Sequence, residues 1–162
     1  MPISRTEREA LIDRYARGPA LFKATIAKVP NEAFQWRPTP GKWSAHEVIV
    51  HCADSETNAH ARIRYLVAEE RTPVIQGYDQ ARWAQVLDYH SLPWEPALAT
   101  VEAVRANTTA LLKRMTDEQW ARVGSHTESG TYGALDWLRT YAEHLEGHAR
   151  QLERNIAAWG SR

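Results

Sequence analysis

The chain has 162 residues, and its 20 basic and 20 acidic side chains cancel to a formal net charge of zero. This balance excludes the basic footprint of a nucleic-acid-binding protein, and no apolar run approaches the roughly 18 residues of a membrane-spanning helix. We therefore expect one domain, residues 1–162, with neither a nucleic-acid nor a membrane partner. The charged N-terminal stretch does not resemble a signal peptide, and Cys52 has no second cysteine to pair with, so we also expect a cytoplasmic location.

The first half of the chain predicts two helices. Ser4-Arg-Thr-Glu7 is a capping box that opens a helix to about Val29, with a kink or break at Gly18-Pro19. A proline-rich linker follows, and a second capping box, Ser44-Ala-His-Glu47, opens a helix that ends at about Glu70 because Thr72-Pro73 resists helical geometry.

The second half predicts two more helices after a long connection. Residues 71–93 should contain a short helix that starts at Asp79. The third long helix should span 94–115, a short turn should start at Thr116, and the fourth helix should span 131–159. We find no convincing alternation that would predict a strand and no internal repeat. The leading fold is an all-α antiparallel four-helix bundle with a long connection between helices 2 and 3.

Two histidines one turn apart, His144 and His148, are the most informative feature of the fourth helix. A spacing of four residues puts both imidazoles on one face, where their neutral nitrogens can bind one metal ion. They lie beside the apolar seam of this helix. The alternative is a solvated flank that carries two unrelated histidines.

The second predicted helix offers a third ligand, His51, on a polar stripe that also contains Asp54 and Ser55. Either of these neighbours could orient the imidazole or a bound water. The alternative is again an ordinary solvated face. Three imidazoles would leave a further coordination position open, which is typical of a catalytic site. Zinc would lower the pKa of a bound water to about 7, and nickel suits the same ligands, so the sequence does not choose between Zn²⁺ and Ni²⁺.

Five motifs follow one another along the chain: Gly41-Lys-Trp43-Ser44, Val50-His51-Cys-Ala53-Asp54-Ser55-x-x-Asn58-x-x-x-Arg62, Glu69-Glu70, Pro73-x-Ile75-x-x-Tyr78-Asp79-x-x-x-Trp83 and Tyr141-x-x-His144-x-x-x-His148. From about Trp36 to Leu152, this ordered set resembles the YfiT-like branch of the DinB superfamily. The resemblance implies a four-helix bundle that binds a metal through His51, His144 and His148. It also implies a metal-dependent hydrolase or a transferase that attaches a thiol such as bacillithiol or mycothiol to an electrophile, and a homodimer.

Three functions remain open from the sequence. In a metal-dependent hydrolase of a small-molecule substrate, Asp54 or Glu47 would be the candidate for proton transfer. In a thiol S-transferase, Asn58, Arg62 and Tyr78 would bind an anionic low-molecular-weight thiol cofactor. A noncatalytic metal-binding bundle would need a fourth protein ligand to close the site, and no further histidine or cysteine stands at ligand spacing.

Overall fold

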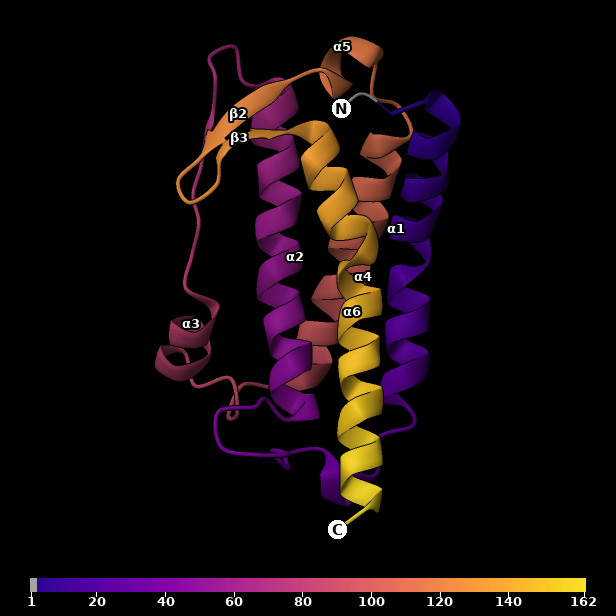
Figure 1. Ribbon diagram of the computed structural model, residues 1–162, viewed down its shortest axis with the longest axis vertical. Helices are drawn as coiled ribbons and strands as arrows, with labels where there is room; N and C mark the ends of the chain where they lie inside the picture. The colour runs from indigo at the N-terminus through magenta and orange to yellow at the C-terminus, as the bar shows by residue number, and fades with distance from the viewer. Residues whose placement is uncertain (1–2) are drawn as a thin grey trace.

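Four long helices form a bundle in the computed structural model, which describes residues 3–162 (Figure 1). They are α1 (Arg5–Ile26), α2 (Ala45–Ala68), α4 (Trp94–Leu112) and α6 (Ala134–Gly160). Shorter helical segments are η1 (Asn31–Ala33), α3 (Gln80–Val86) and α5 (Asp117–Trp120). The predicted all-α four-helix bundle with a long connection between its second and third long helices is confirmed. No helix among the described residues is long and apolar enough to cross a membrane.

The long connection determines how the helices run. After α2 the chain returns along the outside of the bundle, through α3, to the end where α2 began (Figure 1). As a result α2 and α4 run parallel: Glu56 bonds to Arg105, and farther along both helices His60 meets Thr108. In Figure 1, α2 and α4 run upward while α1 and α6 run downward. Each parallel pair therefore packs antiparallel against the other.

The predicted capping boxes begin the helices where expected. The Ser44 hydroxyl accepts from the Glu47 N–H, and the Glu47 carboxylate accepts from the Ser44 N–H at 2.9 Å. Ser4 and Glu7 make the same reciprocal pair at the start of α1. Because these bonds satisfy backbone donors that a first turn leaves open, both starting points were predictable. Asp79 caps the predicted short helix α3.

The sequence predicts a kink or a break at Gly18-Pro19. A break does not occur, since α1 continues through both residues to Ile26. Proline lacks the N–H that would bond to the carbonyl of Tyr15, four residues earlier. That carbonyl accepts a bond from Arg105 Nη1 at 2.7 Å instead. A side chain from α4 therefore satisfies the acceptor that the proline leaves free.

A small sheet was missed by the sequence analysis. It consists of β1 (Val74–Ile75), β2 (Val123–His126) and β3 (Gly130–Gly133), with β1 parallel and β3 antiparallel to β2. The prediction that the fourth helix starts at Thr131 is wrong for the same reason, because 130–133 form β3 and α6 starts at Ala134. Strands of two to four residues are too short to show the alternation that marks a strand in a sequence.

The core lies between the four long helices. The predicted seam of α6 supplies Leu138, Leu145 and Leu152, which are all fully buried. Two polar residues, Glu56 and Arg105, are buried in the same interior. Glutamate and arginine are rarely fully buried unless they are paired, so we expect these two side chains to interact in the middle of the bundle.

Candidate metal centre

The three predicted ligands come together between α2 and α6. One ring nitrogen from each of His51, His144 and His148 lies within 4.8 Å of the other two. His51 is only 1% exposed, whereas His144 and His148 are half-buried, so solvent reaches the cluster through the two residues of α6. The antiparallel packing of α2 against α6 brings His51 level with the two histidines that the fourth helix presents on one face.

The hydrogen bonds of α6 direct two nitrogens at one another. His144 Nδ1 lies 2.7 Å from Glu56 Oε1, and His148 Nδ1 lies 2.9 Å from Gln151 Oε1. Each Nδ1 faces an acceptor oxygen and so carries the proton in the neutral ring, which leaves Nε2 with a free lone pair. The two Nε2 atoms are 3.2 Å apart. Two nitrogens bound to one tetrahedral zinc ion at 2.0–2.1 Å would be separated by about 3.3 Å, so this pair fits a shared metal ion.

The third histidine also fits a ligand role. His51 Nδ1 is buried without a hydrogen-bond partner among residues 3–162. The ring packs on Trp43, with centroids 4.7 Å apart, and against His148 at 4.9 Å. Burial, reinforced by the neighbouring histidines, lowers the pKa of His51 to about 3 and that of His148 to about 4. Both rings are therefore neutral at pH 7, as metal binding requires.

The two carboxylates predicted for proton transfer have other partners. Glu47 accepts from the Ser44 N–H and from two nitrogens of Arg37. Asp54 accepts from the Tyr89 hydroxyl at 2.5 Å. No hydrogen bond or ion pair in the described part of the chain joins either carboxylate to the three histidines. Glu47 is 3% exposed, while Asp54 is half-buried.

The three residues predicted for cofactor binding differ in whether their polar groups already have hydrogen-bond partners. Asn58 donates to the backbone carbonyl of Asp54 at 2.9 Å. The Arg62 guanidinium lies 5.7 Å from the Tyr78 ring centroid and donates to the Tyr141 hydroxyl and the Gln76 carbonyl.

Arg62 has no carboxylate partner among residues 3–162, and the buried Tyr78 hydroxyl has no hydrogen-bond partner there. These two side chains lie together, and each has polar capacity that the fold does not use.

Sequence reasoning missed the pair that supports His144. Glu56 is fully buried and Arg105 is 1% exposed, and two hydrogen bonds of 2.7 Å join them. Burial alone would raise the pKa of Glu56, but the charge of Arg105 and the bond to His144 outweigh it, so the pKa lies below its ordinary value. A signal was present: Glu56 interrupts the apolar face between Cys52 and Ala59, at a position where an ordinary core helix carries an apolar residue.

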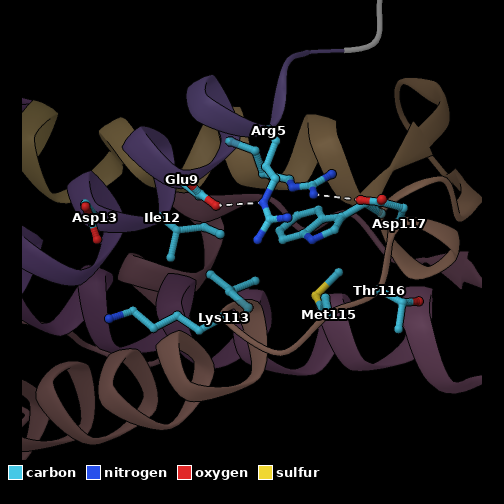
Figure 2. A pocket seen from close by; sticks show the side chains of 11 residues that line it. Arg5, Glu9, Ile12, Asp13, Lys113, Met115, Thr116 and Asp117 are labelled. Carbon is cyan, nitrogen blue, oxygen red and sulfur yellow. Dashed lines mark hydrogen bonds and ion pairs between the residues drawn. The ribbon is translucent and has the colours of Figure 1, made fainter.

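A cleft lies between the start of α1, the end of α4 and α5, away from the three histidines (Figure 2). Its volume is about 490 Å³. Four of the charged side chains that line it form ion pairs: Arg8 bonds to Asp117 at 2.7 Å and Arg5 to Glu9 at 2.9 Å. None of the predicted site residues lines this cleft, so it offers no alternative position for the metal chemistry.

Comparison with known proteins identifies a family and relatives of similar sequence. The sequence profile of the DinB superfamily matches residues 14–152. A protein of Oceanobacillus iheyensis, named as a proposed metal-dependent hydrolase, is 35% identical over 134 residues, which cover 83% of this chain and 77% of that protein.

Two solved structures extend the comparison. The structure of YfiT from Bacillus subtilis, described as a proposed metal-dependent hydrolase with an unusual four-helix bundle topology, aligns with a TM-score of 0.89 at 25% identity over 98% of this chain and 91% of that one. A mycothiol-dependent maleylpyruvate isomerase shares the fold, with a TM-score of 0.62 at 15% identity over 93% of this chain and 60% of that one. With its profile match, its bundle and its motifs in agreement, the chain belongs to the DinB superfamily.

Proposed function

We propose that this protein is a metal-dependent hydrolase of a small-molecule substrate, with a divalent ion, Zn²⁺ or Ni²⁺, held by His51, His144 and His148. The observation that carries the proposal is the pair of Nε2 atoms 3.2 Å apart, each on a ring whose other nitrogen faces an acceptor. The names of the relatives support the same reaction class. A divalent ion with three imidazole ligands acts as a Lewis acid and lowers the pKa of a water or thiol in its open position.

The open position distinguishes this proposal from a noncatalytic metal site. A structural zinc site is closed by four protein ligands. The cluster contains three histidines and, within the described part of the chain, no fourth histidine, cysteine or acidic ligand. The Ser55 hydroxyl, 3.2 Å from His144 Nε2, adds a polar group beside the ligands.

For proton transfer we favour Asp54 over Glu47. Both oxygens of Glu47 already accept hydrogen bonds, and one of its partners is the Arg37 guanidinium. Asp54 is more accessible, and the fully buried Tyr89 holds one of its oxygens in place. A general base needs an oxygen that can reach the substrate or a water, and Asp54 meets that condition better.

A thiol S-transferase is the second candidate, and a specific observation favours it. Arg62 lacks a carboxylate partner, lies next to Tyr78 and stands on the same helix as Asn58, so the three could bind the anionic part of a thiol cofactor. The isomerase that shares the fold is named for its dependence on such a thiol. We also propose that the protein forms a homodimer, as the family resemblance implies.

Metal analysis of the untagged protein tests the proposal. We expect close to one divalent ion per chain in the wild type and in His126→Ala, a control histidine on β2 outside the cluster, and loss of the ion in His51→Ala. A wild type that binds no divalent ion after reconstitution would refute the proposal.

Turnover of ester and amide substrates, with and without added thiol, then separates the two reactions. A rate that does not respond to thiol supports the hydrolase, and a rate that requires thiol supports the transferase.

A further inference from the structure

The Arg105 guanidinium is fixed from all sides in the middle of the bundle. Its Nε and Nη2 donate to the two oxygens of Glu56, and Nη2 also donates to the Tyr141 carbonyl at 2.9 Å. Its Nη1 donates to the Tyr15 carbonyl at 2.7 Å, and its carbon lies 3.8 Å from the Tyr15 ring centroid. One side chain of α4 therefore bonds to α1, α2 and α6, and its position follows from all three.

The Gly18-Pro19 pair in α1 forms part of the site in which this guanidinium is buried. Pro19 leaves the Tyr15 carbonyl without its helical donor, so the acceptor is available to Arg105. A β-carbon on Gly18 would lie 3.2 Å from Arg105 Nη1 and 3.3 Å from the Leu145 side chain. Gly18 thus leaves space for the Arg105 guanidinium. Pro19 leaves free the carbonyl of Tyr15, to which this guanidinium donates.

Glu56 connects the fixed guanidinium of Arg105 to His144, one of the proposed metal ligands. Its Oε1 lies 2.7 Å from His144 Nδ1 and also accepts from Arg105 Nη2. A carboxylate that accepts from Nδ1–H directs the lone pair of the imidazole to Nε2 and fixes the plane of the ring. His144 Nε2 is the atom that faces His148.

We propose that Glu56, held by Arg105 and the Gly18-Pro19 turn of α1, is the positioning residue that selects the Nδ1–H tautomer of His144 and thereby sets the metal affinity of the site. This inference rests on the proposed function, because it assumes that the three histidines bind a divalent ion. It goes beyond the ligand set, since none of these residues is one of the three histidines that would hold the ion.

An ordinary buried ion pair would behave differently. Such a pair would affect folding without changing how the site binds metal. The chain contains a pair with similar bonds nearer the surface: Arg14 of α1 forms two bonds, of 2.7 and 2.5 Å, with Glu146 of α6, and these side chains are 33% and 20% exposed. Glu146 stands between the two histidines in sequence, and its carboxylate bonds to arginine and to neither histidine, so Glu146→Gln is a control for the loss of a carboxylate that pairs with arginine.

The first test uses the wild type alone. Nitrogen NMR of the metal-free protein at pH 9, where free imidazole is neutral, reports which ring nitrogen carries the proton. We expect His144 as the Nδ1–H tautomer. The Nε2–H tautomer, which predominates in free histidine, would overturn the inference whether or not any variant folds.

The second test measures affinity for Zn²⁺ by competition with a chelator, together with the visible spectrum of the Co²⁺-substituted protein. Glu56→Gln should weaken binding by about 10- to 100-fold, the usual effect of losing such a partner, and should change the spectrum. Glu146→Gln should leave both unchanged. Gly18→Ala, which crowds Arg105 and the Leu145 side chain but touches none of the three histidines, should weaken binding by a smaller factor.

The outcomes separate the two proposals. A wild type that binds no metal refutes the proposed function. A wild type and a folded Glu56→Gln variant that bind Zn²⁺ with the same affinity refute only the positioning role.

Discussion

Two buried glutamates on α2, each bonded to an arginine through two nitrogens, invite comparison. Glu47, in the first turn, pairs with Arg37 and caps the helix. Glu56, in the middle, pairs with Arg105 and bonds to His144. The Arg37 side chain is 50% exposed, whereas that of Arg105 is 1% exposed. The same kind of ion pair therefore stands at a helix start where water reaches it, and beside His144 in the middle of the bundle where water does not.

The largest expected effect is the loss of the inner pair. Glu56→Ala leaves Arg105 charged and buried without its carboxylate, so the free energy of unfolding of the metal-free protein should fall by about 3–5 kcal/mol. Urea denaturation measures this change. A loss below 1 kcal/mol would mean that other groups stabilise the charge of Arg105 when Glu56 is absent. The inner pair would then contribute no more to stability than an exposed ion pair does.

Acid should affect the buried histidines and the two buried glutamates in different pH ranges. The folded protein keeps His51 and His148 neutral down to pKa values of about 3 and 4, whereas the unfolded chain protonates them near 6.5. Their contribution is therefore complete above pH 6.5 and is lost as the pH falls, by about 2 kcal/mol for each histidine between pH 7 and 5.

The glutamates follow at lower pH. The bonds of Glu47 to Arg37 and Ser44 outweigh its burial and lower its pKa, as Arg105 does for Glu56, so both contributions are lost only below the ordinary carboxyl pKa near 4.5. Urea denaturation of chelator-treated protein from pH 7 to 3 should resolve the two stages. A constant free energy of unfolding between pH 7 and 5 would contradict the burial of neutral histidines.

The smallest effect should come from the outer pair. Glu47→Ala removes half of a capping box and one ion pair, which together should cost about 1–2 kcal/mol, because the exposed Arg37 can turn to water. Thermal denaturation of the variant, with Zn²⁺ affinity as a second readout, checks this value. A Zn²⁺ affinity equal to that of the wild type would show that Glu47, unlike Glu56, does not influence the metal site. A 10-fold loss of affinity would contradict this difference between the two glutamates.

Local chemistry made much of the fold predictable. The capping boxes at Ser4 and Ser44 and the cap at Asp79 act within one turn, so the sequence contains the whole interaction. The spacing of His144 and His148 likewise fixes a shared helix face before any tertiary contact forms. These features led to the helix starts, the bundle and the histidine cluster that the structure contains.

Features that depend on distant partners were not predictable in the same way. The strands are too short to show a pattern, and β1 pairs with β2 only after the chain has passed through α3 and α4. Pro19 signals a break when α1 is considered alone, and only Arg105, from another helix, explains why α1 continues. The partner of His144 was missed because Glu56 belongs to the apolar face of α2, away from the polar stripe that contains His51.

The long return between α2 and α4 also has a consequence for how the protein forms. Contacts that build the site join residues 88 and 89 positions apart, Glu56 and Ser55 with His144. Closing loops of that length carries a large entropic cost and slows folding. Two of the three proposed ligands lie on α6, which follows the other long helices in the chain, so a nascent chain that ends before α6 contains only His51 of the three. Assembly of the site therefore belongs to the late part of folding, after synthesis has reached α6.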